Sequence, residues 1–293
     1  PFLTQVAQTL ANNKHLSREL LAGHGLPCVP DLLLDEGDDP RGAAARAMLA
    51  AHGRVVVKPN WGNRGVGITT EVETLARLVR ARARARAIDL DEEVVVEPYV
   101  AGGNLRVAVI GGRFAAACEV QRPRLVGGRS AAAQIAALNE DPRRGSWAAP
   151  SLRPMDRIEP DEDLAGHLSV LGLKLGSVVP DGLEVEVTGE ESAVIDRSDE
   201  LHPGWVAVAE RACALLGVDV GGVDLRGPMA AFGRAPGERW RAGEGCLLEV
   251  NVLPGLHLHA LPTEGAARPV FDAFVAYCLQ LPGAPPVCAT VRV

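Results

Sequence analysis

The most constraining feature of this sequence is a run of β-branched residues that leads directly into a glycine-rich loop, VVVKPNWGNRGVG at residues 55–67. Three valines followed by Lys58 are typical of a buried strand that delivers a cation at its end. The glycines that follow, Gly62, Gly65 and Gly67, let backbone N–H groups approach phosphate oxygens without obstruction by side chains. The pattern predicts a loop that binds a nucleoside triphosphate, although a purely structural turn would also place glycines here.

Lysine is rare in this chain, which makes the position of Lys58 informative. It occurs only as Lys14, Lys58 and Lys174, so the 30 basic residues less 3 lysines leave 27 arginines. A slim ammonium can follow phosphate oxygens during transfer better than the rigid fork of a guanidinium can. We therefore expect Lys58 to serve a phosphate group and Lys174 to lie on the surface. The loop is neither a Walker A loop, which needs GxxxxGK(S/T), nor a GxGxxG loop that opens a helix.

The bulk composition predicts a folded protein that binds neither nucleic acid nor membranes. A length of 293 residues allows one large or two ordinary domains, and a net charge of -7 with 4% aromatic residues provides no basic field and no base-stacking surface. No secretory signal or apolar window long enough to span a membrane is present, and the six cysteines lack CxxC spacing, so we expect a cytoplasmic protein with reduced thiols. Because residue 1 is Pro1 and not Met, we expect an upstream domain to be missing or truncated.

Hydrophobic periodicity predicts that helices and strands alternate along the chain. A first helix should run from Asn12 or Asn13 to Gly23 or Gly25. Further helices are expected at 41–51, 73–87, 131–139, 204–217 and 267–280, and strands at 54–58, 93–98, 105–110 and 113–120. The Gly-Gly pair at 111–112 supplies the positive φ of a two-residue hairpin, so the last two strands should be antiparallel.

One helix has a biased sequence, RLVRARARARA at residues 77–87. Alternating arginines on a helix advance by about 200° at each step, so their charge spreads around the helix and does not build one stripe. This pattern favours a solvated helix face over a nucleic-acid contact.

A second group of polar residues lies near the C-terminal end. In LLEVNVLPG, residues 247–255, Glu249 and Asn251 are two apart and therefore project from one face of a strand. Asp224, in GVDL, closes another apolar run. Carboxylate and amide oxygens are the hard ligands that Mg²⁺ prefers when it shares its coordination sphere with phosphates. Together the three residues predict a magnesium site, whereas each acid alone could be an ordinary polar residue at a strand end.

The order of these elements resembles the ATP-grasp superfamily of carboxylate–amine ligases. The matching pieces are NNK, KPNWGNRGVG, VVVEPYVAGGNLRVAVIGG, GVDL and EVNVLPGL, which together cover residues 12 to 256. Connecting phrases such as DRSDELHP and PGLHLHALPTEGAARPV are similar to the ATP-grasp half of cyanophycin synthetases. The resemblance implies an α/β (α+β) fold, the ATP-grasp fold, in which two α+β subdomains clasp ATP and the N-terminal pre-ATP-grasp domain is missing or truncated. The subdomains would be 1–97, the lid and central part, and 98–283, the C-terminal catalytic part, with a tail at 284–293.

The same resemblance implies a role for each part of an ATP site. Two lysines would contact phosphates or adenine, the glycine loop would cover the β- and γ-phosphates, a hinge would hydrogen-bond adenine, and an asparagine would meet the ribose. The residues implied in ATP binding are Lys14, Lys58, Gly62, Asn63, Gly65, Gly67, Glu97, Pro98, Tyr99, Val100 and Asn104. Asp224, Glu249 and Asn251 would hold one or two Mg²⁺ ions, and Arg106 would aim its guanidinium into the same cleft.

The implied reaction joins a carboxylate to an amine. The substrate carboxylate would attack the γ-phosphorus of ATP, giving an acyl phosphate and ADP, with Lys58 and the loop amides stabilising the transferred charge. An amine would then displace phosphate and leave an amide or peptide bond, with the backbone N–H of Gly255 as oxyanion donor. The partners would be small amino-acid or peptide substrates, and the sequence leaves open whether the chain forms a homo-oligomer.

Three residues beyond the predicted metal strand are candidates for the acceptor side: His257, His259 and Arg268. Arg268 could pair with a substrate carboxylate, and His259 could orient or deprotonate the amine. The two histidines could equally be ordinary pocket or core residues, while a zinc site would need more ligands than this HxH pair provides. Two other functions stay open: a phosphotransferase acting on a hydroxyl, and a nucleotide-binding subunit without catalysis.

Overall fold

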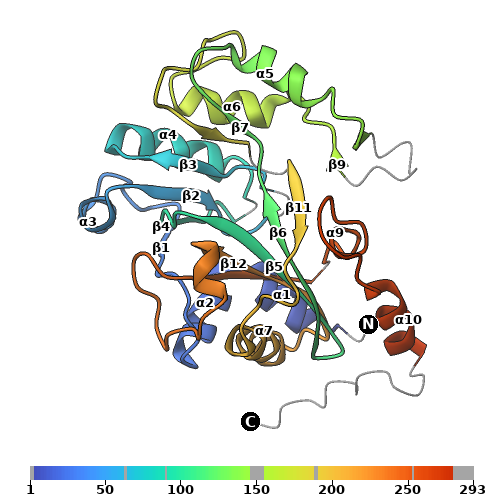
Figure 1. Cartoon of the computed structure of the whole chain (residues 1–293). Helices are drawn as coiled ribbons and strands as arrows, with labels where there is room; N and C mark the ends of the chain where they lie inside the picture. Colours follow the sequence, from blue (N-terminus) through green and yellow to red (C-terminus); the bar gives the residue numbers. More distant parts are fainter. Residues whose placement is uncertain are drawn as a thin grey trace. The chain divides into compact units, whose positions relative to one another are not determined.

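The computed structural model describes residues 3–62, 65–89, 91–145, 155–187, 191–252 and 254–279. These residues form two compact units, each assembled from separate stretches of chain (Figure 1). Unit 1 contains the described residues of 1–29, 100–121 and 193–293, and unit 2 those of 30–99 and 122–192. The chain passes from unit 2 to unit 1 between Tyr99 and Val100, next to the sequence-based boundary at 97–98. Its other passages between units have no counterpart in the sequence-based division.

Unit 1 is built on a five-stranded antiparallel sheet with the strand order β11-β6-β5-β12-β13. Its strands are β5 (Gly103–Ile110), β6 (Arg113–Gln121), β11 (Ala193–Asp196), β12 (Val220–Gly227) and β13 (Cys246–Asn251). Gly111 and Gly112 join β5 to β6 with φ values of 59° and 73°. This confirms the predicted antiparallel hairpin, whose turn needs positive φ at both central positions.

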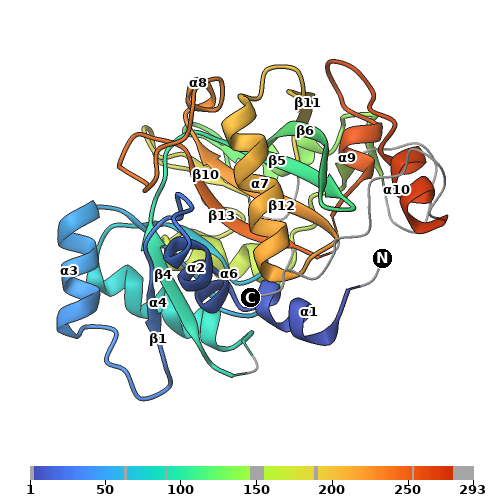
Figure 2. The same cartoon turned by 90° about the horizontal axis from the view of Figure 1, so that it is seen from below.

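Helices of unit 1 pack against this sheet. They are α1 (Gln5–Asn12), α2 (Lys14–Gly23), α7 (Pro203–Leu216), α8 (Met229–Phe232), α9 (His257–Ala260) and α10 (Val270–Leu279). Figure 2 shows α7 lying across the sheet, where its buried Trp205 meets the ring of Phe232 edge to face, with 5.3 Å between ring centroids. The predicted first helix is confirmed as α2, because the Asn13 side chain caps it by accepting from the N–H of Leu16 at 2.8 Å.

Unit 2 contains a four-stranded antiparallel sheet with the order β1-β4-β2-β3. Its strands are β1 (Leu32–Leu34), β2 (Val55–Pro59), β3 (Thr69–Val72) and β4 (Val94–Pro98), and its helices include α3 (Ala43–His52) and α4 (Leu75–Arg86). The predictions for residues 41–59 and 73–98 are confirmed to within two residues. Alternate valines of β2 and β4, such as Val57 and Val96, pack against Leu78 of α4 in a shared core.

Unit 2 also contains a second core, formed by described residues between Leu125 and Val187. Around Leu125, Ile135 and Leu168 it brings together α5 (Ala131–Leu138), α6 (Glu162–Val170), β7 (Arg124–Leu125) and β10 (Val185–Glu186). Two short strands, β8 (Arg144–Gly145) and β9 (Met155–Asp156), pair in parallel. Helix α6 lies against α4, so this segment contacts the four-stranded part of the same unit.

The solvated face predicted for the arginine–alanine stretch is wrong for its inner arginines. Arg82 is 8% exposed and donates to the carbonyl of Asp35, and Arg84 donates to the carbonyl of Ile68 at 2.7 Å. Arginines that point all around a helix must include some that face inward wherever the helix packs against a sheet and another helix. The backbone carbonyls of Asp35 and Ile68 there accept the guanidinium N–H groups.

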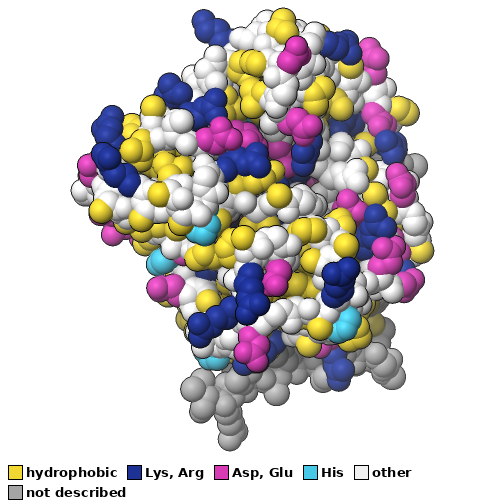
Figure 3. All heavy atoms as spheres, turned by 60° about the vertical axis from the view of Figure 1, so that its left-hand side comes forward, with side chains coloured by type: hydrophobic (Ala, Val, Ile, Leu, Met, Phe, Trp, Pro, Cys, Tyr) yellow, Lys and Arg dark blue, Asp and Glu magenta, His cyan; other side chains and the backbone are white. Residues whose placement is uncertain are grey.

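Other predictions concern the surface and the cysteines. Within the described ranges, no disulfide joins the cysteines. Lys174 is exposed, as predicted. On the face seen in Figure 3, Lys and Arg side chains are interspersed with Asp and Glu side chains. No helix within the described ranges combines the length and apolar character needed to cross a membrane.

Candidate functional site

Four polar residues singled out from the sequence meet on one face of the unit 1 sheet: Arg106, Asp224, Glu249 and Asn251. Strands β5, β12 and β13 are neighbours, and their register places Arg106 opposite Asp224 and Asp224 opposite Glu249. Directly opposed residues of antiparallel strands point to the same side of the sheet. Sheet pairing therefore brings together side chains that are 118 positions apart in the chain.

Asp224 is the hub of this cluster. Both of its carboxylate oxygens accept from Arg106, Oδ1 from Nε and Oδ2 from Nη2, each at 2.7 Å. Asn251 Nδ2 donates to Asp224 Oδ2 at 2.8 Å and lies 3.5 Å from Glu249 Oε1. This bidentate arrangement fixes the plane of the guanidinium against the carboxylate.

The electrostatics of the cluster favour an additional cation. Burial alone would lower the pKa of Arg106, but the charges of Asp224 and Glu249 outweigh burial and raise it above its ordinary value. One permanent guanidinium thus faces two carboxylates, which formally leaves one net negative charge. A divalent ion would be attracted to that charge.

The donor chemistry of the cluster fits Mg²⁺. Two carboxylates and a side-chain amide supply oxygen ligands, and a carboxylate that is paired with Arg106 still has lone pairs to offer. Asn251 would present its Oδ1 after rotation of the amide. The described part of the chain holds no group of three or more His, Cys, Asp or Glu side chains placed for a metal ion. The fit therefore depends on Asn251 as the third ligand.

Unit 2 holds the other predicted centre, a buried ion pair. Lys58 lies on β2 and Glu97 on β4, and the pairing of Val57 with Val96 makes them diagonal neighbours on one face. Lys58 Nζ is 3.0 Å from Glu97 Oε2, with side-chain exposures of 4% and 5%. The strand delivers the lysine as predicted. The carboxylate partner was not predicted, because Glu97 was assigned to the adenine hinge.

The described glycines of the loop all require a backbone that other residues rarely adopt. Gly62, Gly65 and Gly67 have φ values of 142°, 77° and 79°. A Cβ atom on Gly67 would also lie 2.7 Å from Cγ of Pro59. Glycine is therefore needed at position 67 by both conformation and contact. The predicted loop residue Asn63 lies outside the described residues.

The predicted hinge residues are already engaged within the protein. Pro98 ends β4 opposite Val55. The N–H of Tyr99 donates to the carbonyl of Arg54 at 2.9 Å, and the Arg54 guanidinium lies 4.0 Å from the centroid of the Tyr99 ring. This cation–π contact fixes the tyrosine at the end of the strand.

The hinge continues into unit 1, where Arg226 organises the backbone. Arg226 donates through Nε to the carbonyl of Val100 and through Nη1 to Oδ1 of Asn104, both at 2.7 Å. Asn104 is thus held by a buried arginine that the sequence did not single out. Lys14, the first residue of α2, is buried in unit 1, whereas Lys58 belongs to unit 2.

The two acceptor-side histidines have different environments. His257 is exposed, whereas His259 is 2% exposed, with its Nε2 4.0 Å from the thiol of Cys118 and its Nδ1 without a hydrogen-bond partner. Burial, helped by the charge of Arg106, lowers the pKa of His259 to about 4. His259 is therefore a neutral imidazole near pH 7.

Arg268 and Gly255 complete the predicted acceptor side. Arg268 donates through Nη2 to Asp196 at 2.6 Å and to Asp199 at 2.7 Å, and these hydrogen bonds raise its pKa. The guanidinium is thus shared between two carboxylates. The carbonyl of Gly255 accepts from the N–H of Leu258 at 3.0 Å, which places Gly255 at the turn into α9.

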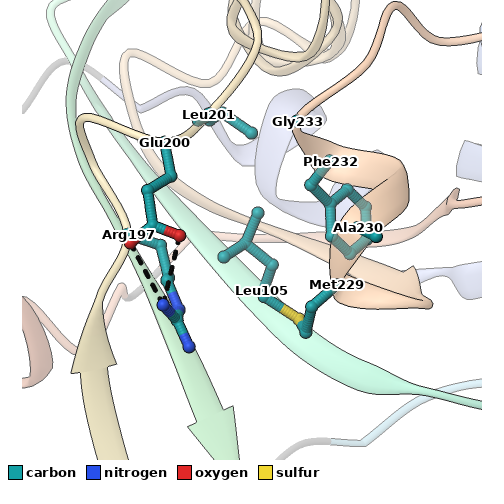
Figure 4. Close-up of a pocket in the computed structure, with 8 residues that line it drawn as sticks. All are labelled: Leu105, Arg197, Glu200, Leu201, Met229, Ala230, Phe232 and Gly233. Atoms are coloured by element: carbon teal, nitrogen blue, oxygen red, sulfur yellow. Dashed lines mark hydrogen bonds and ion pairs between the residues drawn. The ribbon is translucent and has the colours of Figure 1, made fainter.

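A pocket of about 240 Å³ opens on the opposite face of the same sheet (Figure 4). Leu105, Met229 and Phe232 form its apolar wall, while Arg197 and Glu200 pair at 3.1 Å on its other side. Successive side chains of a strand point to opposite faces, so Leu105 faces this pocket while Arg106 faces the oxygen cluster. The pocket and the cluster are therefore separate.

Comparison with known proteins identifies relatives. No protein-family model matches the chain. It is 30% identical to cyanophycin synthetase of Nostoc sp. over 271 residues, which is 90% of this chain and 28% of that protein. It is 25% identical over 283 residues to the bifunctional glutathione biosynthesis protein GshAB of Listeria innocua, with coverages of 94% and 35%.

Solved structures show the same fold. The bifunctional glutathione synthetase from Pasteurella multocida superposes with a TM-score of 0.54 at 24% identity, covering 94% of this chain and 37% of that one. The D-alanine–D-alanine ligase from Coxiella burnetii gives 0.52 at 13% identity, with coverages of 95% and 57%. These likenesses establish the ATP-grasp fold, as predicted.

Among proteins with the ATP-grasp fold, the chain is related to cyanophycin synthetase, which confirms the resemblance seen in its motifs. It spans about 28% of the length of the Nostoc protein.

Proposed function

We propose that this chain is an ATP-dependent carboxylate–amine ligase that forms an amide or peptide bond through an acyl phosphate, with release of ADP. The observation that carries the proposal is the similarity to cyanophycin synthetase over 90% of the chain. The preformed cluster around Asp224 supports it, since a ligase that transfers a phosphoryl group needs fixed charges of both signs.

Each residue of the cluster would have its own role in the reaction. Asp224, Glu249 and Asn251 would hold Mg²⁺, which when bound neutralises phosphate charge and polarises the transferred phosphoryl group. Arg106 is already fixed by Asp224, so it would stabilise negative charge without the cost of being ordered. Lys58 would contact ATP phosphates after its ion pair with Glu97 is broken.

The substrates in this proposal are amino acids or short peptides in the cytoplasm. The carboxylate of one would take the γ-phosphoryl group, and the amine of the other would displace phosphate from the resulting acyl phosphate. His259, neutral near pH 7, would orient the amine by a hydrogen bond, and the N–H of Gly255 would stabilise the tetrahedral intermediate. Arg268 would contact a substrate carboxylate only by sharing its guanidinium with Asp196 and Asp199.

The proposal is tested with the full-length protein, ATP, Mg²⁺ and a panel of amino acids and dipeptides. The expected result is ADP, phosphate and a product whose mass is one water less than the sum of two precursors. AMP and pyrophosphate as products would eliminate the mechanism. A stable phosphorylated product that forms without any amine would favour a phosphotransferase, and ATP binding without turnover would favour a non-catalytic subunit.

A further inference from the structure

The end of the glycine loop is tied to a helix that follows much later in the chain. The N–H of Gly67 donates to Oδ1 of Asp163, in the first turn of α6, at 3.0 Å, although the two residues are 96 positions apart. Both residues belong to unit 2. The N–H of Gly67 is therefore taken by a carboxylate and is not offered to a phosphate, although the sequence predicted that this loop amide would face ATP.

Arg84 of α4 contacts both α6 and the residues that follow the glycine loop. Its Nη2 pairs with the carboxylate of Asp163 and also donates to the Asp163 carbonyl at 3.0 Å. Its Nη1 donates to the carbonyl of Ile68 at 2.7 Å and to the hydroxyl of Thr69 at 3.1 Å. One guanidinium thus bridges α6 and the two residues that follow the loop.

The charges of this arrangement balance. The side chains of Arg84 and Asp163 are 10% and 22% exposed, so solvent screens them only in part. Burial lowers the pKa of Arg84, and Asp163 opposes that effect. Without Arg84, the Asp163 carboxylate would repel a triphosphate bound at the loop, so the arginine is needed for the aspartate to serve as an anchor.

The residues at the end of the glycine loop are held by packing contacts as well as by hydrogen bonds. The N–H of Ile68 donates to the carbonyl of Gly65 at 3.2 Å, closing a tight turn, and a Cβ atom at Gly67 would meet Pro59 and Ile88. A backbone held in this way loses little conformational entropy when it binds a ligand.

We propose that Asp163 and Arg84 are positioning residues that fix the backbone at Gly65 and Gly67 for the binding of ATP phosphates. This inference rests on the proposed function, since it assumes that ATP binds at the loop. It assigns to α6, in the segment between β6 and β11, a role in nucleotide affinity that is separate from any contact with the nucleotide.

The test uses three variants of the full-length protein. Asp163→Ala removes the acceptor, whereas Asp163→Asn keeps an oxygen for the Gly67 N–H but loses the charge that pairs with Arg84. Glu162→Gln is the matched control, because Glu162 is an exposed acid in the same helix turn. Two quantities are measured in each: hydrogen exchange of residues 65–69 by mass spectrometry, and the KM for ATP together with kcat.

The expected results separate positioning from general stability. In Asp163→Ala, amide exchange at 65–69 should be about tenfold faster, and the KM for ATP should rise by a similar factor while kcat changes far less. Asp163→Asn should give a smaller increase in both, and Glu162→Gln should match the wild type. If Asp163→Ala does not fold, Asp163→Asn alone must show the rise in KM.

Failure of the positioning role can be distinguished from failure of the proposed function. Wild-type protein that turns over ATP, with Asp163 variants that exchange faster at 65–69 but keep the wild-type KM, would overturn the positioning role while leaving the ligase proposal intact. Unchanged exchange at 65–69 in Asp163→Ala would overturn it as well. Wild-type protein that neither binds nor consumes ATP would remove the proposed function, whatever the exchange measurements show, and the nucleotide role of Asp163 with it.

Discussion

The two units hold their charged groups in different ways. Unit 2 encloses Lys58 and Glu97 almost completely and places Lys58 Nζ 3.0 Å from Glu97 Oε2. Unit 1 leaves the side chains of Arg106 and Asp224 about one fifth exposed, joins them by two hydrogen bonds and adds Asn251. An enclosed pair is costly to break because the remaining charge cannot be hydrated, whereas a partly exposed cluster can exchange partners with a ligand. The difference indicates that the unit 1 cluster is the readier of the two to accept an ion.

The largest expected effect comes from removing the hub of unit 1. Asp224→Ala should reduce ATP-dependent turnover by about a thousandfold, because it frees Arg106 and removes a proposed metal ligand. Turnover is measured as ADP release. Asp272→Asn, an exposed acid on α10 of the same unit, serves as control and should keep wild-type turnover. Turnover of Asp224→Ala within threefold of the wild type would contradict the assignment.

The coupling energy between Lys58 and Glu97, the enclosed pair of unit 2, should be larger than that between Arg106 and Asp224 in unit 1. Lys58→Met deprives Glu97 of its cation and should lower the free energy of unfolding by about 3 kcal/mol, while Lys58→Met with Glu97→Leu should recover much of that loss. Urea denaturation at pH 7 measures the unfolding free energy of the single and the double variant. The same cycle on Arg106 and Asp224 should give a smaller coupling energy, since water reaches that pair. Equal coupling in the two units would remove the distinction between them.

Acid sensitivity should also differ between the units, through one buried histidine in each. Burial, with the charge of Arg84, lowers the pKa of His167 in unit 2 to about 3, and both of its ring nitrogens lack hydrogen-bond partners. The unfolded chain takes up this proton at a pH near 6.5, so stability should fall by about 1.4 kcal/mol for each pH unit below that value, until about pH 3. For His259 in unit 1 the same loss should end near pH 4.

Replacement of His167 isolates its share of this pH dependence. His167→Leu should lower the slope of unfolding free energy against pH by about 1.4 kcal/mol per pH unit between pH 6 and pH 5, above the range in which most carboxylates titrate, and His259 should supply the slope that remains. The measurement is urea denaturation at pH 7, 6, 5 and 4. A variant with the same slope as the wild type would show that His167 does not remain neutral in the folded protein.

The smallest expected effect compares two glycines with similar backbones. Gly67 in unit 2 and Gly112 in unit 1 have φ values of 79° and 73°, but only Gly67 has side-chain atoms close to where a Cβ would lie. Gly112→Ala should cost about 1 kcal/mol, for the left-handed conformation alone. Gly67→Ala should cost clearly more, because Pro59 must also move. Thermal unfolding checks the order of the two variants, and the reverse order would contradict this reading of the loop.

Local signals in the sequence predicted the longer elements, among them helices α2, α4 and α7 and strands β5 and β6. The Gly-Gly pair specified the β5–β6 hairpin, and Asn13 specified the start of α2, because each acts through neighbours a few residues away. Shorter elements were missed, among them α1, α6, β1, β3 and β11, since segments of three to nine residues carry too little periodicity to stand out.

The charged contacts were harder to predict because they depend on tertiary structure. Glu249 and Asn251 could be placed together from their spacing, but the pairing of Arg106 with Asp224 follows from which strands are neighbours. Nothing near Arg84 in the sequence points to Asp163, and alternating arginines gave no sign of which would face inward. The two units, each built from separate stretches, arise in the same way from contacts distant in sequence.

The most direct test of the ligase proposal combines acyl-phosphate trapping with removal of one proposed metal ligand. Wild-type protein given ATP, Mg²⁺, a carboxylate substrate found in the panel and hydroxylamine should release ADP and form a hydroxamate. Glu249→Gln, with an unchanged thermal unfolding midpoint, should form neither. Hydroxamate and ADP produced by Glu249→Gln at the wild-type rate would contradict the account, because phosphoryl transfer would then not need the oxygen cluster of unit 1.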